Sequence, residues 1–129
     1  MRKRHSLLVL SLFLVLIGIA GPSAAIKPGA TGDDLARAGT RGVEMAGPDI
    51  YFHGVFACSV GLGFPPTWED HPLFLTRGDA TELKPGMVFH LPIAFRLKGR
   101  GCVGFSETVV VTEGGCEVLT SGTRDLAIR

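Results

Sequence analysis

Apolar side chains occupy every second position along one stretch of the chain: Met87, Phe89, Leu91, Ile93 and Phe95. Because successive side chains of a strand point to opposite faces of a sheet, this spacing predicts a strand with one core face. The three valines at 109–111 predict a second strand that is buried more fully. A turn around residues 113–115 would then fold residues 116–120 back onto residues 101–112 as a hairpin.

Helical spacing follows Thr31, whose hydroxyl can cap a helix that carries two acids in its first turn. Apolar or small residues at positions 35, 38, 42, 43 and 46 predict one buried stripe, and Gly47-Pro48 ends the helix. Gly39 and Gly42 weaken this helix by about 1 kcal/mol each relative to Ala.

The remaining stretches complete an α+β pattern of one helix followed by a mostly antiparallel sheet. Residues 51–56 and 58–62 are strand-like, and residues 67–82 are expected to form an exposed connection anchored by Trp68. A length of 129 residues allows one domain at most.

The first 25 residues have the layout of a secretory signal peptide: three basic residues at 2–4, an apolar run at 6–20 and small residues at 23–25. This pattern predicts cleavage near Ala25 and an exported domain over residues 26–129. Two alternatives stay open. Residues 6–26 carry no charge and are long enough to anchor the chain in a membrane of about 30 Å, or they could form a buried helix.

The charge of the chain bears on its binding partners, and its cysteine count bears on disulfide bonds. The chain has 13 basic and 12 acidic residues; residues 1–25 hold three of the basic ones, so the remainder carries 10 minus 12, or −2. No basic surplus is left to favour nucleic acid. The three cysteines, an odd number, cannot all pair within one chain, and Cys102 and Cys116 would lie at opposite ends of the predicted hairpin.

Four segments carry a resemblance to a known family: AIKPGATGDDLARA, SVGLGFPP, LKPGMVF and SETVVVTEGG. In order and spacing they resemble the pita-bread family, which includes methionine aminopeptidase, aminopeptidase P, prolidase, creatinase and ectoine hydrolase. The resemblance covers residues 25–120. It implies the C-terminal part of a catalytic domain, a partial pita-bread fold with a curved, mostly antiparallel sheet and one or two helices, here preceded by an apolar N-terminal helix. It also implies a cytoplasmic location and a homodimer, whereas the leader implies a secreted or membrane-anchored protein.

The same resemblance implies that the metal site of the family is not retained. Its metal-binding His falls on Cys58, its first metal-binding Glu on Pro92 and its last on Ser106, while a further His of the family falls on Pro65. The two metal-binding Asp residues would lie upstream of the helix. We therefore expect no metal and no other cofactor.

A branch of the family that includes creatinase and ectoine hydrolase is resembled by three segments, GFPPTW, FHL and SET. Enzymes of that branch act on small amide or amidine substrates with a His as proton shuttle. This resemblance implies His90 and Glu107 as catalytic residues, with Trp68, Arg96 and Ser106 binding the substrate. Each has a plainer interpretation: a surface imidazole, a solvated acid on the other face, or a loop anchor. His53 and His71 are not assigned to a site, because neither has a second potential ligand at a spacing typical of metal sites.

Together these observations predict a fragment of a hydrolase that takes a small or dipeptide-like substrate. Two alternatives belong to other classes of protein. One is a catalytically inactive truncated remnant, and the other is an exported domain that binds a small ligand.

Overall fold

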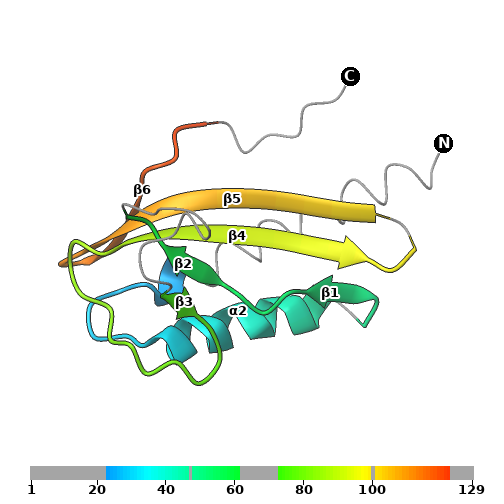
Figure 1. Ribbon diagram of the computed structural model, residues 1–129, viewed down its shortest axis with the longest axis horizontal. Helices are drawn as coiled ribbons and strands as arrows, with labels where there is room; N and C mark the ends of the chain where they lie inside the picture. The colour runs from blue at the N-terminus through cyan, green and yellow to red at the C-terminus, as the bar shows by residue number, and fades with distance from the viewer. Residues whose placement is uncertain (1–22, 47, 62–72, 100, 123–129) are drawn as a thin grey trace.

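In the computed structural model an antiparallel sheet packs against one face of a long helix, over the described residues 23–46, 48–61, 73–99 and 101–122 (Figure 1). The strand order is β3-β2-β4-β5-β6, and β1 pairs with the far end of β4. This arrangement confirms the predicted α+β class. The elements are α2 (Gly32–Ala46), β1 (Ile50–Phe52), β2 (Ala57–Ser59), β3 (Phe74–Leu75), β4 (Val88–Leu97), β5 (Gly101–Thr112) and β6 (Gly115–Val118).

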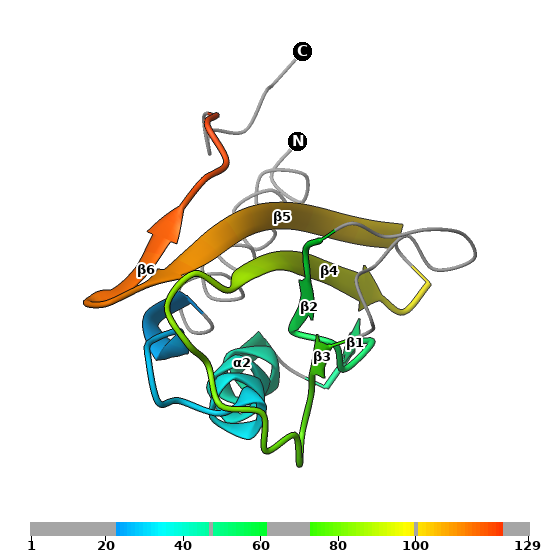
Figure 2. The same cartoon turned by 60° about the vertical axis from the view of Figure 1, so that its left-hand side comes forward.

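Strands β4 and β5 form the long curved centre of the sheet (Figure 2). Their register runs without a break from Val88 opposite Val110 to Leu97 opposite Gly101. The predicted alternation of β4 is confirmed, because one set of its side chains is buried and the other set is half-buried or exposed. The buried set consists of Phe89, Leu91, Ile93 and Phe95, each at most 2% exposed.

The predicted hairpin is also confirmed. Thr112 lies opposite Gly115, which leaves Glu113 and Gly114 as a two-residue turn between β5 and β6. Val109 and Val111 are buried, whereas Val110 is half-buried on the other face.

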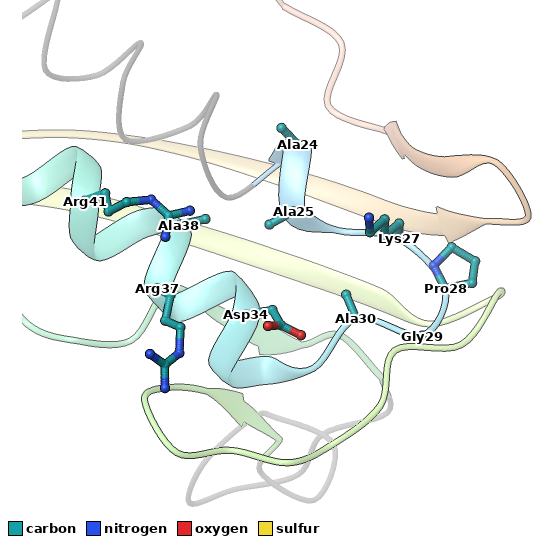
Figure 3. A pocket seen from close by; sticks show the side chains of 10 residues that line it. All are labelled: Ala24, Ala25, Lys27, Pro28, Gly29, Ala30, Asp34, Arg37, Ala38 and Arg41. Atoms are coloured by element: carbon teal, nitrogen blue, oxygen red, sulfur yellow. The ribbon is translucent and has the colours of Figure 1, made fainter.

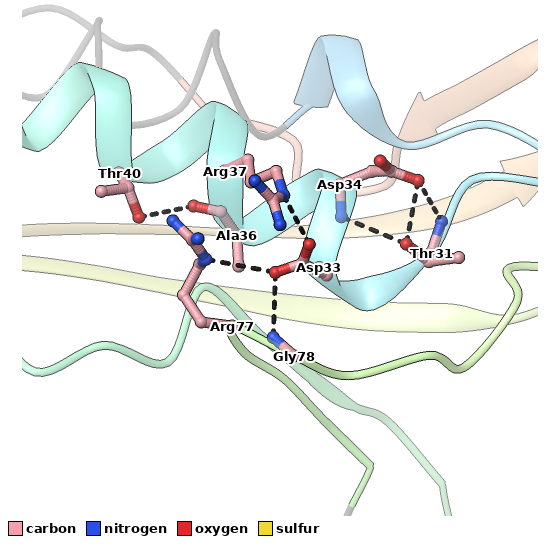
Figure 4. A network of polar contacts seen from close by, with 8 residues as sticks. All are labelled: Thr31, Asp33, Asp34, Ala36, Arg37, Thr40, Arg77 and Gly78. Carbon is pink, nitrogen blue, oxygen red and sulfur yellow. Dashed lines mark hydrogen bonds and ion pairs between the residues drawn. The ribbon is translucent and has the colours of Figure 1, made fainter.

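The N-terminus of α2 carries the predicted cap (Figure 4). The backbone N–H of Asp34 donates to Thr31 Oγ1 at 3.2 Å, and both the N–H and the hydroxyl of Thr31 donate to Asp34 Oδ2 at 2.9 Å. This reciprocal pattern is a capping box, and it satisfies backbone donors that a helix leaves unpaired at its start.

Asp33 ties the first turn of α2 to the loop before β4 (Figure 4). Its Oδ1 accepts the Gly78 N–H at 2.9 Å and Arg77 Nε at 3.1 Å, and its Oδ2 accepts Arg37 Nε at 2.5 Å. These contacts, led by the Gly78 N–H, lower the pKa of Asp33 below its ordinary value of 3.8.

The buried stripe of α2 differs in part from the predicted one. Leu35 and Ala36 are fully buried, and Ala38 is only half-buried. Gly39 is buried because the ring of Phe56 packs directly on it: a Cβ at Gly39 would lie 2.1 Å from Phe56 Cδ1. The glycine that weakens the helix therefore makes room for a core aromatic ring.

The segment between β2 and β4 corrects a second prediction. Residues 67–82 were expected to form an exposed connection, but β3 lies within them and pairs with β2. Leu75 is fully buried opposite Ala57. A short strand of two residues has no periodicity of its own, so only its tertiary partners define it. Trp68 and His71 lie outside the described residues.

The predicted leader and apolar N-terminal helix lie almost entirely outside the described residues, and they stay predictions. Of the part described, Ile26 is 1% exposed and belongs to the core. The Cys116 thiol donates to the Ser23 carbonyl at 3.2 Å, so residues just before the expected cleavage position contact β6. Among the helices of the described residues, none combines the length and apolarity needed to span a membrane.

Candidate functional site

An open pocket of about 590 Å³ lies on the face of β4 and β5 that points away from the core. Its polar side chains are two imidazoles and one hydroxyl, and no Asp, Glu, Lys or Arg is among its described lining residues. The lining consists of His53, His90, Pro92, Ile93, Ala94, Gly104, Phe105 and Ser106.

The structure brings two predicted site residues, His90 and Ser106, into this pocket. His90 and Pro92 share the outer face of β4 because they are two positions apart on a strand. Pro92 lies directly opposite Ser106 on β5, so Ser106 faces the same side. The side chain of His90 makes no hydrogen bond to any other described residue, which leaves both ring nitrogens available to a ligand.

His53 is a pocket residue that the sequence did not reveal. It follows β1 directly, and the pairing of Phe52 with Phe95 brings it beside the outer face of β4. Its Nδ1 accepts the Val55 N–H at 3.1 Å, and its Nε2 lies 3.2 Å from the Pro92 carbonyl. With Nδ1 as acceptor, Nε2 carries the proton and donates to Pro92. Only the register between β1 and β4 shows that His53 lies in the same pocket as His90, because the two histidines are far apart in the sequence.

Glu107, predicted to act with His90, is not in the pocket. It is 2% exposed and lies opposite Leu91 on the core face of the sheet. The physical reason is strand alternation: Glu107 is two positions before buried Val109 and so shares its face. The plainer interpretation was a solvated acid on the other face: Glu107 does lie on the other face, but it is buried there and not solvated.

The other two predicted substrate-binding residues do not line this pocket. Arg96 is exposed near the end of β4, opposite Cys102, and its guanidinium lies 5.9 Å from the centre of the Tyr51 ring. Cation–π geometry of this kind holds an exposed Arg over an aromatic face. Trp68 lies outside the described residues.

The three positions that the resemblance assigns to metal ligands lie on neighbouring strands. Cys58 on β2 pairs with His90, and Pro92 pairs with Ser106, so all three share one face. Pro92 offers no side-chain donor, and the buried Cys58 thiol is 3.7 Å from the His90 carbonyl. These side chains do not fit a two-ion carboxylate site. In the described part of the chain, no three His, Cys, Asp or Glu side chains gather around a common point.

A second pocket, of about 510 Å³, lies between residues 24–30 and α2 (Figure 3). Its charged side chains are Lys27, Asp34, Arg37 and Arg41. The pKa of Asp34 is lowered, chiefly because its carboxylate accepts the Thr31 N–H. None of the predicted site residues lines this second pocket.

Comparison with known proteins gives the class to which this fold and pocket belong. Residues 15–113 match metallopeptidase family M24, and the chain belongs to this family. The match begins inside the segment predicted to be a leader.

Two curated relatives are similar over most of this chain. An uncharacterized hydrolase/peptidase, y4tL, of Sinorhizobium fredii is 36% identical over 113 residues, which are 88% of this chain and 27% of the relative. Ectoine hydrolase of Halomonas elongata is 31% identical over 117 residues, 89% of this chain and 28% of the enzyme. The chain thus spans little more than a quarter of the length of the relatives it matches.

A solved structure agrees in fold. The prolidase from Pyrococcus horikoshii superimposes with a TM-score of 0.76 at 25% identity, over 90% of this chain and 32% of the prolidase. The predicted partial pita-bread fold is therefore confirmed.

Proposed function

We propose that this chain carries the pocket face of an M24 hydrolase that acts on a small amide or amidine substrate without the metal ions of the family. The observation that carries the proposal is the pocket shared by His53, His90 and Ser106. It agrees with the similarity to an enzyme named ectoine hydrolase.

The two imidazoles have different roles in this proposal. His53 is held by hydrogen bonds at both ring nitrogens, so it positions the Pro92 backbone and shapes the pocket. His90 is the proton shuttle, because its ring is open to the pocket and imidazole can act as both general acid and general base. Ser106 offers a hydroxyl, as donor or acceptor, to the substrate amide.

The side chains at the family's ligand positions support catalysis without metal. Pro92 and Ser106 face each other where the resemblance implies two glutamates, and neither supplies a carboxylate. A neutral amide suits this pocket best, since a cationic amidine would need an acid that the described lining does not contain.

The test combines a substrate panel with metal analysis on the purified full chain. Xaa-Pro dipeptides, creatine and ectoine are incubated with wild type, His90→Ala and the control Lys98→Ala, which alters an exposed residue of the β4–β5 turn. We expect turnover that is lost in His90→Ala and kept in Lys98→Ala, with bound Mn, Co or Zn well below one ion per chain. Turnover unchanged in His90→Ala contradicts the role of His90. Stoichiometric metal that disappears in Cys58→Ser contradicts the metal-free site.

A second candidate, a domain that binds a small ligand without catalysis, is favoured by the position of Glu107. Its burial on the core face leaves the pocket without a described carboxylate to orient a substrate or a water. Titration calorimetry separates the two functions. Saturable binding of a panel member that His90→Ala weakens, with no product formed, supports the binding domain.

A further inference from the structure

The side chains on the outer face of β4 and β5 differ in size along the pocket that holds His90. The register places them in four directly opposed pairs: His90 with Thr108, Pro92 with Ser106, Ala94 with Gly104, and Arg96 with Cys102. The pocket extends from His90 over the second and third pairs, and the fourth pair is not among its described lining residues. Because Ala94 and Gly104 together carry a single methyl group, the floor of the pocket is lowest over these two residues.

Neither the backbone conformation nor the described packing requires a glycine at position 104. Glycine inside a strand destabilises it relative to alanine, and it often marks a bend or a place where a ligand or another backbone comes close. Gly104 does not have a positive φ. A Cβ built on it would have Ile93 O at 3.5 Å and Ala94 Cβ at 3.6 Å as its nearest described neighbours, and both are ordinary contacts. What the glycine provides is therefore space inside the pocket.

This space is bordered by apolar groups. Ala94 contributes a methyl group, Gly104 contributes its Cα, and the ring of Pro92 lies two positions away on the same face. The described lining contains no charged side chain. A charged group placed over Ala94 and Gly104 would lose water without gaining a partner, so the space suits an apolar group.

The order of the groups along the face gives the direction in which an amide would lie, and this direction rests on the proposed function. Hydrolysis adds water to the amide: the carbonyl carbon gains the hydroxyl, the C–N bond breaks, and the nitrogen leaves with the proton that His90 has taken from the water. The leaving nitrogen therefore lies nearest to His90, and the carbonyl lies beside Ser106. The acyl chain then continues over Ala94, which is two residues and about 7 Å beyond Pro92 along β4.

We propose that Gly104 makes the pocket specific for amides with a short, unbranched apolar acyl chain, which lies over Ala94 and Gly104. Each methylene group of this chain that leaves water strengthens binding about fourfold. A side chain at position 104 would occupy the same space, so its size sets the longest acyl chain that the pocket admits.

Chemical-shift titration of the ¹⁵N-labelled full chain with acetamide and butanamide tests this specificity. Butanamide has two more methylene groups, so wild type should bind it at least about tenfold more tightly, with shifts at the Ala94 and Gly104 signals. In Gly104→Val the two amides should bind within about twofold of each other, because the valine fills the space of the chain. The same preference in wild type and Gly104→Val, or no preference in wild type, overturns the proposal.

Two further variants control for bulk and for folding. Cys102→Val adds a valine to the next pair on the same face, outside the described lining, and should keep the preference for butanamide. Gly104→Ala should leave the urea midpoint unchanged or higher and should reduce the preference about fourfold, which provides a test even if the valine variant does not fold. A lost preference in Cys102→Val, or a lower midpoint in Gly104→Ala, overturns the proposal.

Release of ammonia from the same two amides separates this specificity from the proposed function. A chain-length preference that depends on Gly104, without ammonia release, supports the acyl site and overturns the hydrolase. Ammonia release with a preference for butanamide that Gly104→Val leaves unchanged supports the hydrolase and overturns the role of Gly104.

Discussion

Replacing Gly39 with alanine separates what the helix prefers from what the core allows. Helix propensity alone predicts that Gly39→Ala stabilises the protein by about 1 kcal/mol. The structure opposes this gain, because the new Cβ would lie 2.1 Å from Phe56 Cδ1 and 2.2 Å from Cε1. Forcing an extra methyl group into a packed core costs about 1–3 kcal/mol.

The clash determines that the substitution destabilises the protein, since Phe56 cannot easily move aside. It is 3% exposed, and its ring centre lies 4.6 Å from that of Phe52. We therefore take the upper end of the packing cost and expect a net loss of about 2 kcal/mol in the free energy of unfolding. Urea denaturation of the purified proteins measures this loss, provided that the slope of the unfolding free energy against urea concentration is the same for both.

A double-mutant cycle with Phe56→Val isolates the contact, because valine removes Cδ1 and Cε1, the two ring atoms that would lie nearest to the new Cβ at position 39. In that background Gly39→Ala should be neutral or stabilising by up to about 1 kcal/mol, giving a coupling energy of about 2 to 3 kcal/mol. If Gly39→Ala stabilises the otherwise wild-type chain, or has the same effect in both backgrounds, the packing argument is refuted.

Three further predictions concern the helix cap, acid stability and the leader. Thr31→Ala should lower the free energy of unfolding by about 1 kcal/mol and Thr31→Ser by less, and equal losses in urea denaturation would contradict the role of the hydroxyl. The folded-state pKa of Asp33 is below 3.8, so its contribution is present above pH 3.8 and is lost as the pH falls through the lower folded value. Between pH 5 and pH 2 wild type should therefore lose stability more steeply than Asp33→Asn, and parallel curves would contradict this. N-terminal sequencing of protein made in a bacterium should find cleavage near Ala25, whereas an intact Met1 on cytoplasmic protein refutes export.

Local sequence determined the elements whose signals lie within a few residues. The period of two in β4 placed four apolar side chains in the core, and Thr31 with Asp34 set the start of α2. The turn after Thr112 set the β5–β6 hairpin. In each case neighbouring residues supply both the pattern and the interaction that stabilises it, so no distant partner is needed.

The alternation of side chains along β5 also predicts the face on which Glu107 lies, although its charge suggests the opposite face. An acid suggests solvent or a pocket, yet its spacing from Val109 and Val111 places it on the core face. The geometric rule prevailed because a strand in a continuous ladder cannot turn one side chain to the opposite face without a bulge.

Tertiary structure alone decided the pocket and the contacts around it. His53 reaches the outer face of β4 only through the pairing of β1, and β3 exists only because β2 lies beside it. Gly39 lowers the helix propensity of α2, and only the packing of Phe56 against it explains why a glycine is needed there. These features join segments that are distant along the chain, and their energy comes from packing and register, which no local pattern of residues records.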